Sequence, residues 1–174
     1  MSAALTARVH PEGRLACRGA VWRCALGKGG IHPAREKREG DGATPAGFLP
    51  LRRVLYRADR LRAPDCAVPV EPIAPADGWC DDVAHPAYNT RIRLPHEARH
   101  EVLWRQDPVY DIIGILGWND APVERGRGSA IFLHLARPGY PPTEGCIALA
   151  EPDLRALLAM GVAGIEVPGF EGTG

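Results

Sequence analysis

The 174-residue sequence lacks several features that mark whole classes of protein. No run is long and apolar enough to span a bilayer, so we expect no transmembrane segment. Basic and acidic residues number 21 each without a basic block, which argues against a nucleic-acid partner. Hydrophobic residues make up 45% of the chain and charged residues 24%. These values favour a soluble globular protein, and the length suits a single domain spanning 1–174.

The sequence also lacks the cysteine and histidine spacing of disulfide or metal proteins. Its five cysteines are odd in number and scattered, and none forms a CxxC pair. Cys17 and Cys24 fall in apolar, strand-like runs, where buried and inert thiols are expected. His96 and His100 are four residues apart but have no second ligand pair. We therefore predict no metal and no cofactor.

The first ten residues contain no positively charged segment followed by an apolar stretch, as a secretory signal would. This predicts a cytoplasmic protein, or a periplasmic one if the sequence given lacks a leader. Arginine greatly outnumbers lysine, at 19 to two. Guanidinium groups suit fixed, planar contacts with carboxylates, which leaves an anionic substrate open. Nothing in the sequence indicates the oligomeric state.

The apolar pattern predicts a mainly β fold with one short helix near the C-terminus. Pro152 suits the first turn of that helix, at about 152–160, and Gly161 suits its end. Residues 31–46 are polar and rich in Gly and Pro, which predicts a loop. The expected strands cover residues 5–10, 14–18, 20–26, 47–57, 110–118, 129–134, 146–149 and 163–167.

Residues 58–108 form a long segment with seven prolines and no clear periodicity. A connection of this length inside a compact domain is usually functional or has local structure of its own. We expect it to act as a cap or pocket wall beside the main sheet. His100 and Trp104 are the side chains most suited to that wall.

The segment from His134 to Cys146 carries the clearest chemical signal. A predicted strand delivers the histidine, a loop with three prolines follows, and Gly145-Cys146 leads into the next strand. A free thiol has a pKa near 8.5, so a cysteine nucleophile needs a base that accepts its proton and then stabilises the thiolate as an ion pair. Gly145 lets the backbone approach a substrate closely. Judged on residues alone, a packed thiol and a structural histidine stay open as the simpler interpretation.

A resemblance to a known family favours the catalytic interpretation. Thr143-Glu-Gly-Cys-Ile147, with Ile131-Phe-Leu-His134 upstream, resembles the signature of the L,D-transpeptidase catalytic domain (YkuD) family. That family has a histidine on a strand, a loop, and then Ser/Thr-x-Gly-Cys followed by an apolar residue. The stretch 40–48 resembles its early Thr-Pro-x-Gly-x-Phe element, and 110–118 resembles the strand before the histidine. The resemblance spans roughly residues 20–167.

The resemblance implies roles for particular residues. Cys146 would be the nucleophile and His134 its base, and the N–H groups of Gly145 and Cys146 would hold the oxyanion. It also implies a sandwich-like β fold with the cysteine at the floor of a cleft. In this family a backbone carbonyl commonly orients the other ring nitrogen of the histidine. The sequence does not show which carbonyl does so here.

Two positions depart from the family pattern. Glu144 stands where the family usually has His, and Ala148 stands where it usually has Arg or Asn. Both positions adjoin the substrate, so substrate or acceptor choice stays open. Glu144 either receives an ammonium group or faces solvent.

The remaining candidate contacts with substrate lie in the same segment as the cysteine. Arg137 either grips a substrate carboxylate or is solvated. Tyr140 either lines the cleft or packs on the adjacent prolines. Thr143 completes this set.

The family's substrate is a peptidoglycan stem tetrapeptide, attacked at the bond before its terminal D-alanine. Attack by Cys146 would release D-alanine and leave a thioester. Water as acceptor gives an L,D-carboxypeptidase, whereas an amine gives a 3–3 crosslink or an exchanged D-amino acid. The missing export signal favours water and a role in recycling muropeptides. A non-catalytic wall-peptide-binding module and an unrelated cysteine hydrolase are the alternatives.

Overall fold

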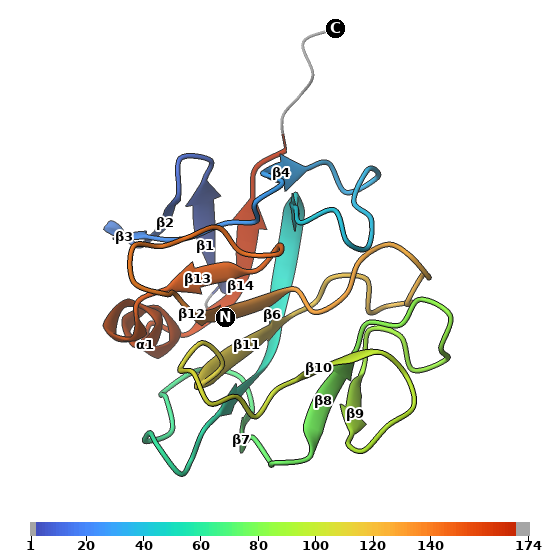
Figure 1. The fold of residues 1–174 in the computed structure, drawn as a ribbon. Coiled ribbons are helices and arrows are strands. Elements are labelled where there is room, and N and C mark those ends of the chain that lie inside the picture. The colour runs from blue at the N-terminus through green and yellow to red at the C-terminus, as the bar shows by residue number, and fades with distance from the viewer. Residues whose placement is uncertain (1–2, 170–174) are drawn as a thin grey trace, which may run out of the picture.

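A computed structural model describes residues 3–169, and these residues are mainly β with one short helix (Figure 1), as predicted. Strands account for 37% of the chain and helix for 5%. Within the described residues no helix is long and apolar enough to cross a membrane.

A nine-stranded sheet forms the body of the molecule, with the order β13-β12-β11-β6-β14-β1-β2-β3 and with β7 paired to β6. Neighbours are antiparallel except for the pairs β1–β14, β12–β13 and β6–β7. The strands are β1 (Leu5–His10), β2 (Arg14–Cys17), β3 (Ala20–Arg23), β6 (Gly47–Tyr56), β7 (Val70–Pro72), β11 (Ile112–Leu116), β12 (Phe132–Leu135), β13 (Ile147–Leu149) and β14 (Val162–Val167).

The two ends of this sheet meet. Beyond β3 the chain continues to Ala25, which exchanges two backbone hydrogen bonds with Ala148 of β13, at 2.8 and 3.0 Å. This contact joins β13, at one edge of the sheet, to the chain that follows β3, at the other edge. The sheet therefore curls round a common core. The core is apolar, with Leu15, Leu49 and Ile165 fully buried. The sheet therefore supplies the two packed layers that the family resemblance implies.

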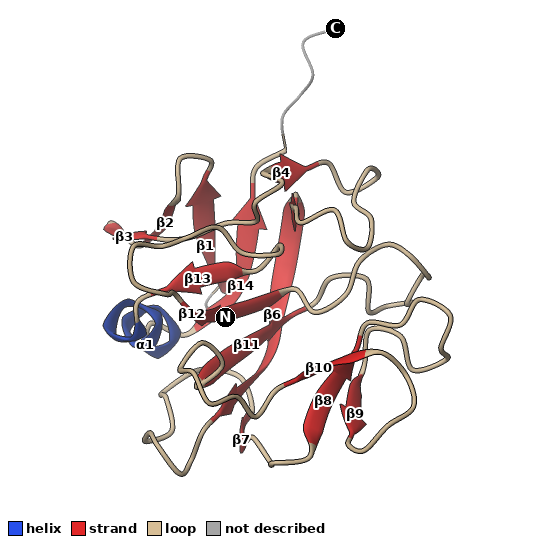
Figure 2. Ribbon diagram, in the orientation of Figure 1, coloured by secondary structure: helices blue, strands red, loops and turns tan. Residues whose placement is uncertain are grey.

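The helix α1 (Glu151–Ala159) closes one end of this core, as Figure 2 shows in blue. It begins one residue before the predicted start, with Pro152 in its first turn. Its buried residues are Leu154, Leu157 and Leu158, the spacing of a single helix face. Gly161 follows with φ +81°, which suits the predicted end of the helix.

Three predicted strands begin later than the apolar pattern suggested. The run 110–118 pairs only over Ile112–Leu116, 129–134 becomes Phe132–Leu135, and 146–149 becomes Ile147–Leu149. Ala130 has φ +54°, a left-handed conformation that no regular strand accommodates, and so delays the start of β12. Cys17 and Cys24 are buried, as expected, and burial raises the pKa of Cys24 to about 12.

The segment 58–108 has a small sheet of its own, which Figure 1 shows in green beside β6 and β11. It contains β8 (Asp77–Cys80), β9 (Arg91–Arg93) and β10 (His100–Val102) in the order β10-β8-β9. Three or four residues per strand are too few for a periodicity to be visible in the sequence. The predicted loop 31–46 likewise holds one pair of two-residue strands, β4 (Ile31–His32) and β5 (Thr44–Pro45).

Candidate active site

Cys146 and His134 project from neighbouring strands onto one face of the main sheet. β12 and β13 are parallel, with His134 opposite Ala148. Since side chains alternate along a strand, Phe132 and His134 share a face with Cys146 and Ala148. The Cys146 Sγ accepts a hydrogen bond from the Phe132 N–H at 3.4 Å and donates one to the Ala130 carbonyl at 3.2 Å. The thiol is therefore held in place by the backbone that leads into β12.

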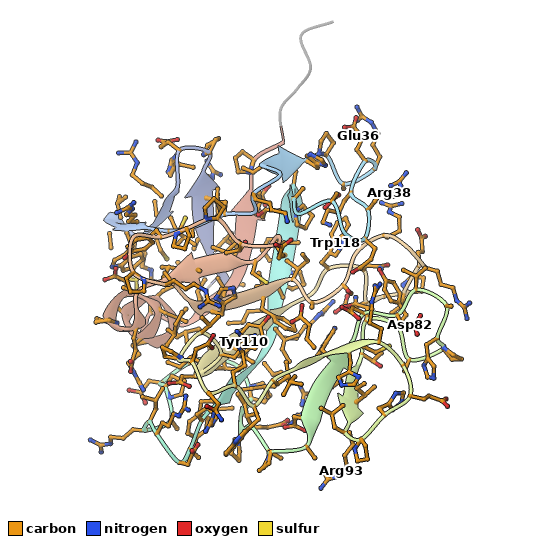
Figure 3. All side chains as sticks on the ribbon, in the orientation of Figure 1. Glu36, Arg38, Asp82, Arg93, Tyr110 and Trp118 are labelled. Carbon is orange, nitrogen blue, oxygen red and sulfur yellow. The ribbon has the colours of Figure 1, made fainter. Side chains whose placement is uncertain are left out.

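His134 is held in a single orientation by its own strand. Its Nδ1 lies 3.0 Å from the Leu135 carbonyl, which can only accept, so Nδ1 carries the hydrogen and Nε2 is left as an acceptor. The ring packs edge-on against Tyr110, with centroids 5.4 Å apart. Figure 3 labels Tyr110 just before β11. The Leu135 carbonyl is thus the orienting group that the sequence did not reveal.

Burial keeps both groups uncharged. The side chain of His134 is 8% exposed, and loss of solvation lowers its pKa to about 4. Cys146 is 7% exposed, and burial, reinforced by the nearby charge of Glu101, raises its pKa to about 12. In the resting cleft the thiol and the imidazole are therefore both neutral. The ion pair expected from the sequence is disfavoured because burial penalises both charged forms.

The sulfur is buried but not sealed. Cys146 and His134 both line a cleft of about 790 Å³, which is large enough for a short peptide. Ala148 lines the same cleft, so the residue that replaces the family's usual Arg or Asn leaves room beside the imidazole. The wall opposite the strands includes Glu101 and Arg105 from the segment 58–108. The expectation that this segment forms a pocket wall is confirmed.

The turn before Cys146 is fixed by two threonines. The Thr143 hydroxyl accepts from the Gly145 N–H at 3.1 Å and donates to the Cys146 carbonyl at 2.7 Å. Thr44 donates to the Gly145 carbonyl at 2.9 Å and accepts from the Gly27 N–H at 2.9 Å. Thr143 lines the cleft, but its hydroxyl is occupied within the turn. It positions the cysteine, whereas the sequence suggested a contact with substrate.

Only glycine fits at position 145. Its φ is +134°, and an added Cβ would lie 2.7 Å from the Ala43 carbonyl oxygen. Its N–H already donates to Thr143, while no described residue accepts a hydrogen bond from the Cys146 N–H. Of the two backbone donors predicted for an oxyanion, the one at Cys146 is therefore the one available in the resting structure.

Arg137 lines the cleft near its rim. It reaches Asp107 at 3.3 Å, and Arg105 holds the same carboxylate through two hydrogen bonds of 2.7 and 2.6 Å. These contacts lower the pKa of Asp107 to about 2, with Arg105 the larger cause. Two guanidinium groups thus share one carboxylate, and this group of three side chains has one excess positive charge.

Two other predicted contacts with substrate lie differently. Glu144 borders the cleft but is exposed and paired with Lys28 at 2.9 Å. Tyr140 is not among the residues that line the cleft. It lies under the Arg23 guanidinium, 4.4 Å from the ring centroid, in a neighbouring groove along β2 and β3. The expectation that Tyr140 lines the cleft is therefore wrong; its backbone is left-handed, with a φ of +55°.

The expectation that His100 and Trp104 form the outer wall is wrong. Neither His100 nor Trp104 lines the cleft. His100 contacts the Ala98 carbonyl at 2.7 Å, and Trp104 packs under Arg57. Glu101 lines it instead, because a shift of one residue along a strand moves a side chain to the other face. If residues 100–102 had been recognised as a strand, the alternation of side chains along that strand would have pointed to Glu101.

Within residues 3–169 no group of three or more His, Cys, Asp or Glu side chains is arranged to hold a metal ion. His85 and His96 do pack edge-on, with ring centroids 5.0 Å apart, in the segment 58–108. No third ligand joins them among the described residues.

The family model for the L,D-transpeptidase catalytic domain, YkuD, matches residues 11–167. The chain has no significant match among curated proteins or among solved structures. The matched range covers most of the sequence, including both strands of the site and the segment 58–108. Members of this family are cysteine acyltransferases that act on peptidoglycan peptides. The chain therefore belongs to the L,D-transpeptidase catalytic domain (YkuD) family.

Proposed function

We propose that Cys146 and His134 act as nucleophile and base in an L,D-carboxypeptidase that removes the terminal D-alanine from peptidoglycan stem tetrapeptides. The observation that supports this proposal is that a buried thiol and an imidazole with its Nδ1 held by a backbone carbonyl line one cleft of about 790 Å³. The acceptor nitrogen of His134 is free of its strand carbonyl, and the thiol is held by Phe132 and Ala130.

Acylation begins with the neutral pair. Nε2 of His134 takes the Sγ proton as the sulfur attacks the carbonyl carbon before the terminal D-alanine. The Cys146 N–H donates to the resulting oxyanion, a contact that is typically worth ~10²–10³ in rate. The imidazolium then gives its proton to the leaving amine. D-alanine departs, and a thioester joins the tripeptide to Cys146.

Deacylation by water uses the same two residues in reverse. Nε2 of His134 accepts a proton from water as the oxygen attacks the thioester carbonyl, and the departing sulfur recovers that proton. Water needs no second peptide site. The polar cleft wall, with Glu101, Arg105 and Arg137, is compatible with its entry. The groove along β2 and β3, which Tyr140 lines, shares a single lining residue, Pro142, with the cleft.

The test is the product formed by purified protein from a disaccharide-linked or UDP-linked tetrapeptide. The proposal predicts tripeptide and free D-alanine in equal amounts, with no dimers. Dimers or D-amino-acid-exchanged tetrapeptides as the main product would instead establish the transpeptidase alternative. An excess of a D-amino acid in the same assay sharpens the result, because a hydrolase continues to form tripeptide.

A non-catalytic peptide-binding module is the second candidate, favoured by Ala148 and Glu144 at family positions that usually carry other residues. Labelling with a carbapenem separates the two. A catalytic Cys146 is acylated and gains the mass of the drug, whereas a module without an activated thiol is not. The cytoplasmic location stays a prediction, and fractionation of cells that express the chain tests it.

A further inference from the structure

Glu101 is a charged residue in the cleft that the proposed chemistry does not use. It lies on β10 directly opposite Trp79 of β8. Trp79 packs edge-on against Phe132 of β12, with centroids 5.1 Å apart. Cross-strand neighbours share a face, so Glu101 points in the same direction, toward the strands that carry Cys146 and His134. The small sheet thus presents a carboxylate to the reaction centre.

This carboxylate has a hydroxyl partner but no cation. Oε2 of Glu101 accepts from the Tyr110 hydroxyl at 2.7 Å, and within residues 3–169 Glu101 forms no ion pair and its Oε1 has no partner. The arginines of the cleft are already paired with other carboxylates. Arg105 and Arg137 share Asp107, and Arg99 is held by Asp81 at 3.0 Å.

The buried lysine of the cleft is committed as well. Lys37 is held by Asp41 at 2.7 Å and donates to the Arg38 carbonyl at the same distance. Glu101 therefore brings a carboxylate without an ion-pair partner among the described residues into a partly buried part of the cleft.

In the absence of substrate, the negative charge of Glu101 opposes formation of the Cys146 thiolate. A carboxylate near a sulfur disfavours the thiolate, and after burial Glu101 is the largest cause that raises the pKa of the Cys146 thiol. Burial also raises the pKa of Glu101 itself. The other titratable or charged groups around this pair are Lys37, Glu39, Asp81, Arg99, Arg105, Tyr110, His134, Arg137 and Glu144.

We propose that Glu101 binds a primary ammonium group of the substrate, and that this pairing neutralises the negative charge beside Cys146. The proposal rests on the proposed function, because it names the part of the peptide that the same cleft recognises. An ammonium is a compact cation with three donors, so it can reach the unpaired Oε1 while Tyr110 keeps Oε2. The matching substrate is a peptide whose acyl residue is a diamino acid with a free side-chain amine. The substrate then supplies the charge that the empty cleft lacks.

The direct test compares two tetrapeptides, one with a free side-chain amine and one with that amine acetylated. The wild type is expected to prefer the free amine by at least about tenfold in kcat/KM, since the acetylated peptide leaves a half-buried carboxylate unpaired. The variant E101Q is expected to reduce that preference to less than about threefold, mainly by losing rate on the free amine. D81N is the matched control, because Asp81 borders the same cleft but is already paired with Arg99. An undiminished preference in E101Q, or none in the wild type, overturns the proposal.

A second measurement needs no peptide turnover. The rate at which iodoacetamide alkylates Cys146 is measured as a function of pH in E101Q, D81N and the wild type. Alkylation of the other cysteines is monitored by mass. E101Q is expected to titrate at lower pH and to react at least about threefold faster at pH 8, whereas D81N follows the wild type. An unchanged E101Q profile contradicts the charge effect. If no peptide is turned over but this shift is seen, the proposed function fails while the electrostatic role of Glu101 stands.

Correct folding of E101Q is checked by its melting temperature. The Gln side chain can still accept from Tyr110 through its amide oxygen, so the wall keeps that contact. Loss of the preference together with an unchanged melting temperature identifies a lost contact with substrate. E101D provides rescue, because it restores the charge and is expected to recover part of the preference.

Discussion

The floor of the cleft and its outer wall are held in place by different forces. The floor is made by β12 and β13, whose Leu133 and Ile147 are fully buried in the main core. The wall is made by β8 to β10, which are three or four residues long. A buried apolar sheet fixes backbone position through many contacts, whereas short strands depend on a few hydrogen bonds.

Two polar residues tie the wall to the main sheet. Asn89 uses all four of its amide hydrogen-bonding positions, accepting from Trp79 Nε1 and the Ala130 N–H and donating to the carbonyls of Trp118 and Asn119. Arg57 donates to the Arg105 carbonyl at 2.6 Å. We therefore expect substitutions in the floor to alter the chemistry, and substitutions in the wall to alter substrate recognition and local stability.

The largest effect is expected at the floor, from Cys146→Ala. Removal of the nucleophile should lower kcat by at least ~10³-fold, because neighbouring groups rarely take over the function of a missing catalytic residue. The melting temperature should change little because Ala fills most of the same space. Turnover is measured as D-alanine release, and activity within tenfold of the wild type would exclude Cys146 as the nucleophile.

The next largest effect is expected from Gly145→Ala. The new Cβ would lie 2.7 Å from the Ala43 carbonyl, in a conformation that strains any residue except glycine. We expect a loss of about 1–3 kcal/mol in the free energy of unfolding, and about 10²-fold in activity through displacement of the sulfur. Gly139→Ala is the control, because Gly139 also has a positive φ but nothing within 4 Å. Equal effects of the two variants would refute the role of the tight contact.

The third prediction concerns pH. With a pKa of about 4, His134 is neutral in about 90% of molecules at pH 5, against about 3% for an ordinary histidine. The kcat/KM profile should therefore stay flat from pH 7 to 5 and fall about tenfold per unit below about 4. A decline of about 25-fold between pH 7 and 5 would show a histidine with an ordinary pKa instead.

The protein must be shown to be folded at each pH of that profile. The pKa of His134 is lowered on folding, so the unfolded chain takes up its proton first. Stability therefore falls as the pH decreases from about 6.5 toward 4. Circular dichroism at each pH separates this loss from loss of the base.

A smaller effect is expected at the wall, from Asn89→Gly. Glycine accepts the φ of +57° at this position, so the change removes the amide without adding strain. Trp79 Nε1 and the Ala130 N–H would lose their acceptor, which should cost about 2–5 kcal/mol in the free energy of unfolding. Activity should fall about tenfold because Ala130 holds the thiol. Denaturant unfolding measures the first effect, and an unchanged midpoint would show that the wall does not depend on Asn89.

The smallest effect is expected from Glu144→Gln. Glu144 forms an exposed pair with Lys28, and such pairs contribute under ~1 kcal/mol. We expect less than a twofold change in kcat/KM and in the thiol titration. A tenfold loss of activity on the tetrapeptide would instead place Glu144 in direct contact with substrate.

The floor was largely readable from the sequence and the wall was not. Long apolar runs located β6 and β11, and the segment from His134 to Cys146 was recognised through its order of strand, loop and Gly-Cys. Ala130 escaped detection because its positive φ is set by tertiary contacts, among them the Asn89 side chain. Thr143 was assigned to substrate because the sequence does not show where a hydroxyl points.

The wall escaped prediction for two physical reasons. Strands as short as β10 carry too few residues to show an alternation, so His100 was chosen where Glu101 faces the cleft. The stability of the wall also comes from single side chains such as Asn89 and Arg57, which have no local pattern. The charge states of Cys146 and His134 could not be predicted from the sequence either, because the burial of both residues follows only from the assembled fold.

The most direct test of the central claim is the intact mass of the protein after brief incubation with tetrapeptide. The account predicts a covalent tripeptide adduct on the wild type, located on Cys146 after digestion and released by hydroxylamine as a thioester, and no adduct on Cys146→Ala. Turnover without any adduct on Cys146, or an adduct on another residue, would contradict it.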